Sequence, residues 1–253
     1  MCIDTSEEEQ REGPPYFATA RSPSPWAPLR GSTRAAAARY PPAMRSVSRL
    51  ALADARRTPW RNSRGFTDEL ALEPRGASFE RGDFHWRISR AKVAESGPFS
   101  SFPGCERILV LLDGGALSLE HGEHEPRARV RTLEPYRFSG HWPTHATLLG
   151  EPASDFNVIY RPECVRADVE VLRVGTRRAR LSLDASIAFL HLPRGAAVAR
   201  VTGEEDSLRL TSGDSLSMSQ LALGDELDVQ GERDDTLALL VRIEAMPTDS
   251  RGS

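Results

Sequence analysis

Cysteine, lysine and long apolar runs are all scarce in this chain of 253 residues. The three cysteines, Cys2, Cys105 and Cys164, are odd in number and far apart. They fit neither a disulfide framework nor a zinc pattern, which favours a reducing compartment. No stretch approaches the ~20 apolar residues of a membrane span. Lys92 is the only lysine, and we interpret the preference for arginine as genomic base composition.

Strong net charge is also missing. The formal charge of -3 and the isoelectric point near 6.1 give no electrostatic reason to expect a nucleic-acid partner. The first seven residues are acidic and contain no apolar segment, so they do not resemble a signal peptide. We therefore predict a cytoplasmic protein with neither nucleic acid nor a membrane as its partner.

Motifs of the common catalytic and cofactor sites do not occur. There is no Gly-x-Ser-x-Gly nucleophile elbow, no phosphate loop and no dinucleotide fingerprint. The run His121–Glu125 collects metal-capable groups, but it lies at an expected hairpin tip without a third distant ligand. We interpret this run as a solvated turn and the lone Cys105 as an inert thiol. We predict no catalytic residue, no metal and no cofactor.

Residues 1–46 differ in composition from the rest of the chain. Proline recurs through them, and they cannot bury enough apolar area to offset an ordering cost of ~1–2 kcal/mol per residue. Two interpretations stay open: a disordered extension, or a mis-annotated start whose true first residue is Met44. N-terminal sequencing of the native protein distinguishes them. We also expect a disordered C-terminus over residues 247–253.

From Val47 onward, short alternating segments predict β-strands with turns roughly every 8–12 residues, as in a sandwich or barrel. The clearest hairpin signal is Arg107–Leu112, the turn Asp113–Gly115 and the returning segment Ala116–Glu120. One or two turns of helix are expected over Ser48–Ala55. The other predicted strands cover residues 84–91, 127–131, 146–149, 156–160, 169–174, 178–183, 187–192, 197–201, 207–211, 220–223 and 236–243.

The predicted strands form two comparable halves, residues 48–160 and 161–246, inside a folded region of 47–246. Each half contains a strand–turn–strand unit that ends in Gly-Asp or Gly-Gly. Two stacked jelly-roll lobes in an all-β fold agree with this strand count.

Polar side chains occupy alternate positions of two predicted strands. Arg87 and Ser89 share one face of the first strand, and Asp155 and Asn157 share one face of the second. An unsatisfied polar group inside a barrel costs about 1–3 kcal/mol. The cluster is therefore either a structural network, such as an Arg87–Asp155 or Arg107–Asp155 pair, or a pocket where arginine binds a ligand carboxylate. The residues alone favour the network slightly.

Five stretches of the chain recur together in one known family. They are Thr58–Asn62, Gly65–Glu69, Phe84–Ser89, Gly97–Arg107 and Asp155–Arg161. In order and spacing they resemble the HutD/Ves family, over about residues 48–246 and most strongly before residue 165. Several motifs in register are much more specific than any one of them.

The resemblance implies a bicupin, which is two RmlC-like cupin β-barrel lobes in one chain, without the usual cupin metal. The family is associated with histidine utilisation, and its members look like small-molecule binders that moderate the pathway. The implied ligand is an acidic intermediate such as N-formylglutamate or urocanate, bound in a regulatory or homeostatic role.

The resemblance also places a ligand site in the N-terminal lobe, with Arg87 and Arg107 as anion contacts. The remaining expected contacts are orienting hydrogen-bond groups and two apolar walls: Asn62, Ser89, Ser100, Asp155 and Asn157, with Trp60 and Phe102. Two other classes stay open. One is a metal-independent isomerase or hydrolase acting on a small carboxylate, with Asp155 as acid or base. The other is a protein-interaction module with a vestigial pocket.

One departure from the family affects the expected ligand. Family members usually show Trp-Lys-Asn-Gly-Gly-Gly, whereas Trp60-Arg61-Asn62 is followed here by Ser63-Arg64-Gly65. Two glycines that allow close backbone approach have been replaced by side chains. If this loop lines the pocket, Arg64 fills it, adds an anion contact or changes the ligand.

Overall fold

The computed structural model describes residues 45–59, 65–124 and 127–247. Trp60, Asn62 and the Ser63-Arg64 replacement lie outside these ranges, as do nearly all of the two terminal segments for which disorder was predicted. In the described part of the chain, no helix is long and apolar enough to cross a membrane.

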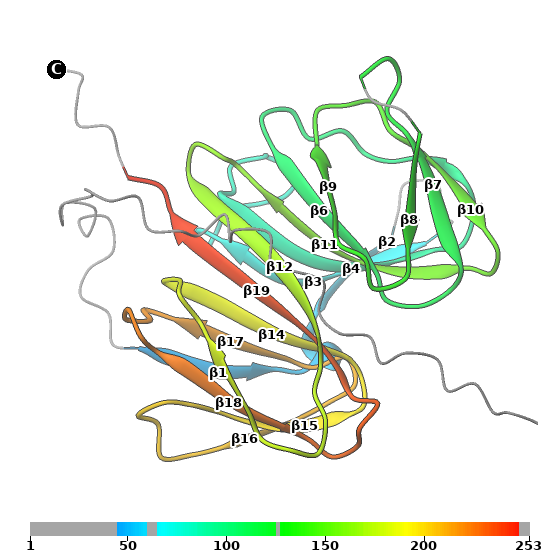
Figure 1. The fold of residues 1–253 in the computed structure, drawn as a ribbon. Helices are drawn as coiled ribbons and strands as arrows, with labels where there is room; N and C mark the ends of the chain where they lie inside the picture. The colour runs from blue at the N-terminus through cyan, green and yellow to red at the C-terminus, as the bar shows by residue number, and fades with distance from the viewer. Residues whose placement is uncertain (1–44, 60–64, 125–126, 248–253) are drawn as a thin grey trace, which may run out of the picture.

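The first lobe is a sandwich of two antiparallel sheets (Figure 1). The six-stranded sheet has the order β2-β3-β4-β11-β6-β9, and the four-stranded sheet has the order β5-β10-β7-β8. Their bounds are β2 (Arg56–Pro59), β3 (Phe66–Glu73), β4 (Trp86–Val93), β5 (Gly97–Pro98), β6 (Glu106–Leu111), β7 (Ala116–Glu120), β8 (Ala128–Arg131), β9 (Tyr136–Ser139), β10 (His145–Leu149) and β11 (Ala153–Tyr160).

The second lobe repeats this plan with sheets of order β1-β17-β14-β19-β12 and β13-β18-β15-β16. The predicted all-β fold of two jelly-roll lobes is thereby confirmed. The bounds are β1 (Ser46–Leu50), β12 (Val165–Arg173), β13 (Ala179–Ser182), β14 (Ile187–Arg194), β15 (Ala196–Val201), β16 (Leu208–Thr211), β17 (Ser215–Ser219), β18 (Glu226–Gly231) and β19 (Leu237–Ala245), with a 3-10 helix η1 (Leu52–Asp54) after β1.

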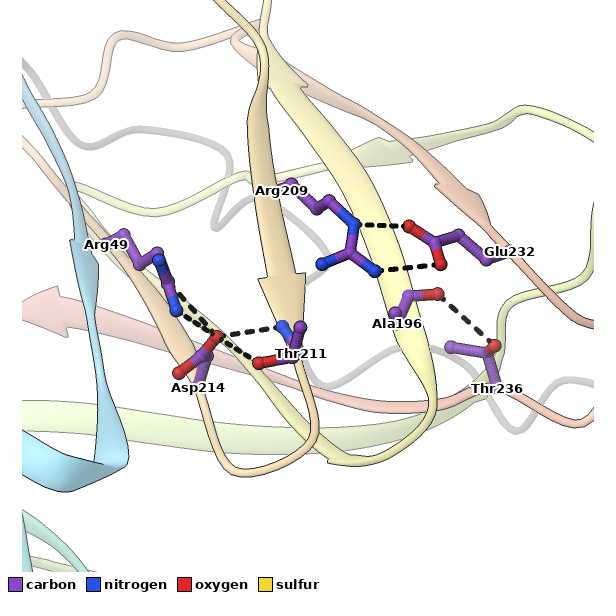
Figure 2. Close-up of polar contacts among 7 residues, drawn as sticks. All are labelled: Arg49, Ala196, Arg209, Thr211, Asp214, Glu232 and Thr236. Atoms are coloured by element: carbon purple, nitrogen blue, oxygen red, sulfur yellow. Dashed lines mark hydrogen bonds and ion pairs between the residues drawn. The ribbon is translucent and has the colours of Figure 1, made fainter.

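The first strand belongs to the second lobe, because β1 pairs with β17 along its whole length. Figure 2 shows the polar contact that supports this pairing. Arg49 Nε donates to Asp214 Oδ2 over 3.1 Å, and the same oxygen accepts from the backbone N–H and the hydroxyl of Thr211 at 2.8 Å. The predicted helix over Ser48–Ala55 is therefore wrong, apart from the short η1.

Two local predictions are wrong because they overlooked the two-layer arrangement. β6 and β7 do not form a hairpin: β6 pairs with β11 and β9, whereas β7 pairs with β10 and β8. The turn at Asp113 instead carries the chain from one sheet to the other. Residues 220–223 are a turn rather than a strand, since Gln220 has φ 57° and Ala222 N–H donates to Asp225 Oδ2 over 2.7 Å.

The crossing turn depends on a glycine. Gly114 has φ +78°, and a Cβ there would lie 2.8 Å from Ala153 Cβ. Gly76 has a similar φ of +86° but nothing within 4 Å of the same atom. We expect Gly76→Ala to cost about 1–2 kcal/mol from backbone strain alone, and Gly114→Ala to cost about 1–3 kcal/mol more from overpacking. Urea unfolding of both variants checks this; equal losses would contradict the steric argument.

The two lobes share a core. Alternate residues of β4, β6 and β11 point away from the first sandwich and pack against the five-stranded sheet of the second lobe. Trp86 and Phe189 meet across this interface with ring centroids 5.5 Å apart, and Phe156 is fully buried in it. Each such side chain stabilises the fold by about 1.5–3 kcal/mol. The interface leaves the opposite face of the same three strands free to line the interior of the first lobe.

Candidate functional site

A cavity of about 670 Å³ opens into the first lobe, and we call it the N-lobe cavity. This volume suits a small metabolite. Every predicted site residue that the structure describes lines it. These residues are Arg87, Ser89, Ser100, Phe102, Arg107, Asp155 and Asn157.

Strand register explains why these residues converge. β11 lies between β4 and β6, and Ile159 on β11 is opposite both Arg87 and Arg107. Because side chains alternate along a strand, Asn157 and Asp155 lie on the same inward face as Ile159. The two arginines therefore flank the middle strand at one level, about 10 Å apart at their Cα atoms from the spacing of adjacent strands.

Arg87 is held between a carboxylate and an aromatic ring. Its Nε donates to Glu69 Oε2 over 2.8 Å, and its guanidinium carbon lies 4.1 Å from the centre of the Phe79 ring. Arg87 is 6% exposed. In the described part of the chain, its two terminal nitrogens have no hydrogen-bond partner, so this two-pronged donor edge is left for a ligand. Such an edge matches the two oxygens of a carboxylate.

Arg107 is oriented by an amide and a carboxylate. Its Nε and Nη2 both donate to Asn157 Oδ1, over 2.8 and 2.5 Å, and Nη2 lies 3.8 Å from Asp155 Oδ2. Asn157 Nδ2 in turn donates to Asp155 Oδ1 over 2.9 Å. Phe99 covers the guanidinium at 4.4 Å. Nη1 forms no hydrogen bond with any described residue, so a second donor also remains for a ligand.

Burial shifts the titration of this cluster. Desolvation lowers the pKa of Arg107 to about 10, against the favourable charge of Asp155, so the guanidinium stays cationic at neutral pH. Desolvation raises the pKa of Asp155, although Arg107 and the hydrogen bonds from Asn157 and Ala91 oppose that rise. The site therefore presents fixed positive charge beside a carboxyl group that is costly to ionise.

The cluster combines both arrangements that the sequence left open. An Arg107–Asp155 pair exists, whereas the predicted Arg87–Asp155 pair does not form because Arg87 pairs with Glu69. A pure structural network would use every donor, yet the Ser89 hydroxyl has no hydrogen-bond partner among the described residues. Some of the polar groups hold each other, and the rest face the cavity.

The sequence analysis assigned no role to three side chains that line the cavity, Glu69, Phe79 and Phe99. Glu69 and Phe99 lie inside stretches that carried the family resemblance, but neither was assigned a role. A bulge of β3 next to Glu69 sets that residue opposite Ser89. Phe79 lies in the connection between β3 and β4, where no strand pattern indicated its position. It also packs against Phe102, with ring centroids 5.3 Å apart.

The histidine run is not a solvated turn throughout. His121 is fully buried, with Nδ1 2.9 Å from the Thr144 hydroxyl and Nε2 3.0 Å from the Tyr136 hydroxyl. Gly122, Glu123 and His124, which follow it, are exposed. Within the described ranges, no three His, Cys, Asp or Glu side chains gather where they could hold a metal ion. Burial raises the pKa of the Cys105 thiol, which favours the inert interpretation.

Two β-sandwich lobes with a cavity inside one of them define a bicupin. Distant solved structures support the fold alone: the bacterial pirin YhhW from Escherichia coli, solved with nickel(II), is 10% identical with a TM-score of 0.54. The match covers 80% of this chain and 99% of that chain.

The family follows from closer matches. The HutD family model matches residues 52–239, and the chain belongs to that family. An uncharacterised 21.2 kDa protein in the hutC 3′ region of Pseudomonas putida is 33% identical over 195 residues, 74% of this chain and 95% of that protein. Protein Ves from Escherichia fergusonii is 37% identical over 122 residues, 47% of this chain and 61% of that protein.

A solved relative completes the comparison. The structure of HutD from Pseudomonas fluorescens SBW25, in a formate condition, is 27% identical with a TM-score of 0.64. The match covers 79% of this chain and all of that one. The predicted HutD/Ves resemblance is confirmed.

Proposed function

We propose that this protein binds a small carboxylate metabolite in the N-lobe cavity, in a regulatory or homeostatic role. The observation that carries the proposal is the pair of buried arginines flanking Ile159, each oriented by the protein and each with donors left over. Orienting an arginine beforehand reduces the entropy lost when a ligand binds. Ser89 and Ser100 supply further polar contacts, and Phe102 an apolar wall.

Membership of the HutD family narrows the ligand class. The family's association with histidine utilisation favours an acidic intermediate of histidine breakdown, such as N-formylglutamate or urocanate. The cavity can hold a molecule of that size.

A thermal-shift panel tests the proposal. The full chain is heated with N-formylglutamate, urocanate, glutamate and histidine, and with primary amides of the first two as uncharged controls. A ligand at 100 times its Kd stabilises by about 2.7 kcal/mol, which raises the Tm by roughly 5–10 °C. We expect that rise with one acidic intermediate and not with its amide. A flat panel, or equal shifts from acid and amide, would contradict carboxylate binding.

Recovery of the ligand separates binding from turnover. After long incubation with the protein, the ligand is examined by NMR. An unaltered spectrum agrees with a binding protein, whereas a new product would indicate an isomerase or hydrolase.

A further inference from the structure

Asp155 has one carboxylate oxygen that accepts no hydrogen bond from the described residues. Oδ1 accepts two hydrogen bonds, from Ala91 N–H over 3.1 Å and from Asn157 Nδ2 over 2.9 Å. The recorded contact of Oδ2 is Arg107 Nη2 at 3.8 Å, which is too long for a hydrogen bond. Asp155 is 1% exposed, but it lines the N-lobe cavity. Oδ2 is not sealed inside the protein: it is open to the cavity, where a ligand can supply the donor that the described residues do not.

Among the described residues, the charges that line the cavity balance before any ligand enters. Arg87 on β4 and Arg107 on β6 face Glu69 on β3 and Asp155 on β11. At the lining, Arg56 on β2 and Glu80 add one charge of each sign. Arg90 points to the other face of β4, although its charge also acts on Asp155. A ligand carboxylate therefore adds a negative charge that these residues do not balance.

Protonation of a carboxyl group removes one negative charge, and Asp155 is better placed for it than Glu69. Glu69 Oε2 already accepts a hydrogen bond from Arg87 Nε over 2.8 Å, whereas no hydrogen bond to Asp155 Oδ2 is formed by the described residues. Asp155 is more deeply buried, and burial already raises its pKa. A ligand that accepts from the free Nη1 of Arg107 lies next to Oδ2, where like charge raises that pKa further.

We propose that Asp155 takes up a proton from solvent when a carboxylate ligand binds in the N-lobe cavity. This inference rests on the proposed function. The proton resides on Oδ2, and the resulting O–H donates a hydrogen bond to a ligand oxygen. Asp155 is then a binding residue that acts in its neutral form, while Oδ1 keeps its two donors. Binding strengthens as the pH falls toward the apo pKa of Asp155, by as much as about tenfold per pH unit.

Calorimetry in several buffers measures this proton directly. N-formylglutamate, which is fully ionised at neutral pH, is titrated into the full chain in phosphate, imidazole and Tris at one pH. The slope of the observed enthalpy against the buffer ionisation enthalpy gives the protons taken up. We expect a slope approaching about one proton per ligand in the natural protein. We expect no slope in Asp155→Asn, which keeps the size of the side chain. Glu232→Gln, the loss of a carboxylate in the second lobe outside the cavity, should keep the slope.

The outcomes separate the two proposals. Binding with zero slope in the natural protein would overturn proton uptake and leave carboxylate binding intact. A slope that persists in Asp155→Asn, or disappears in Glu232→Gln, would overturn the assignment to Asp155. Absence of binding by N-formylglutamate and by every acid of the thermal-shift panel would overturn the proposed function and this inference with it.

A second measurement does not depend on a folded variant. The infrared difference spectrum between the free and N-formylglutamate-bound natural protein should gain the carbonyl stretch of a protonated carboxyl group. Its absence from the bound protein would contradict the inference, whatever the variants do.

Discussion

Replacement of Arg87 by methionine is expected to weaken carboxylate binding at least about 100-fold, while the protein still folds. The two terminal nitrogens of Arg87 supply charge-assisted hydrogen bonds worth about 1.5–3 kcal/mol each, and a tenfold change in Kd corresponds to about 1.4 kcal/mol. Methionine keeps an unbranched apolar stem against Phe79 but has neither charge nor donor. Calorimetric titration with the acid that gives the thermal shift measures the loss.

Arg87→Met leaves Glu69 without its cation, so its effect on folding needs a control. The Glu69 side chain is 15% exposed, and we expect the unpaired carboxylate to cost about 1–3 kcal/mol. The double variant Arg87→Met/Glu69→Gln removes that stranded charge. It should recover most of the stability without recovering the affinity.

Arg209→Met is the matched control in the other lobe. Arg209 donates through Nε and Nη2 to the two carboxylate oxygens of Glu232, over 2.6 and 3.0 Å (Figure 2). It lies on β16 in the second lobe and does not line the N-lobe cavity. Arg209→Met replaces arginine by methionine, as Arg87→Met does, and it also breaks an ion pair. Its ligand affinity should stay within about twofold of the natural protein. If Arg87→Met binds as tightly as Arg209→Met, Arg87 is structural and the anion contact lies elsewhere.

Most of the candidate site was accessible from sequence because strand alternation is a strong constraint. Once 84–91 and 155–160 are strands, Arg87 and Ser89 must share a face, and so must Asp155 and Asn157. What alternation cannot supply is the order of strands in a sheet. The position of β11 between β4 and β6 unites the two pairs with Arg107, and that order comes from contacts distant in sequence.

The wrong β6–β7 hairpin and the open choice of a partner for Asp155 have the same cause, because both depend on the order of strands in the sheets. An Asp-Gly-Gly turn between two apolar strands is compatible with a hairpin and with a crossing between sheets, and only the packing of Gly114 against Ala153 distinguishes them. The sequence left open whether Arg87 or Arg107 pairs with Asp155, and Arg107 is the one that does. In the structure β3 is adjacent to β4 and offers Glu69 to Arg87 instead. Choice between two available carboxylates is a tertiary property that local pattern does not encode.

His191, in the interface between the lobes, is expected to make the fold sensitive to acid. It is fully buried, stacks on Phe156 with centroids 5.1 Å apart, and places Nδ1 2.9 Å from the Ser215 hydroxyl. Nε2 has no hydrogen-bond partner among the described residues. Desolvation, aided by the charge of Arg90, lowers the pKa of His191 from 6.5 to about 3.

A histidine whose folded pKa is depressed stabilises the fold above its unfolded pKa, and that stability is lost as the pH falls toward the folded pKa. Below pH 6.5 the His191 imidazole binds a proton in the unfolded chain but stays neutral in the folded protein. At 1.36 kcal/mol per pH unit, this linkage removes about 3 kcal/mol between pH 7.5 and 4.5. His191→Phe keeps an aromatic ring against Phe156 but cannot titrate, so its unfolding free energy should fall about 3 kcal/mol less over that interval.

Comparing pH dependences rather than absolute stabilities is what makes this test decisive. Any packing cost of the phenylalanine is present at both pH values and cancels, as do the carboxylates common to both proteins. The same substitution at His141 should leave the natural pH dependence unchanged, because that side chain is exposed to solvent in the folded chain as well as in the unfolded one. If His191→Phe follows the natural protein from pH 7.5 to 4.5 in urea unfolding, His191 accepts its proton while the lobes stay packed. The interface must then contain enough polar surface or water around Nε2 to hold an imidazolium.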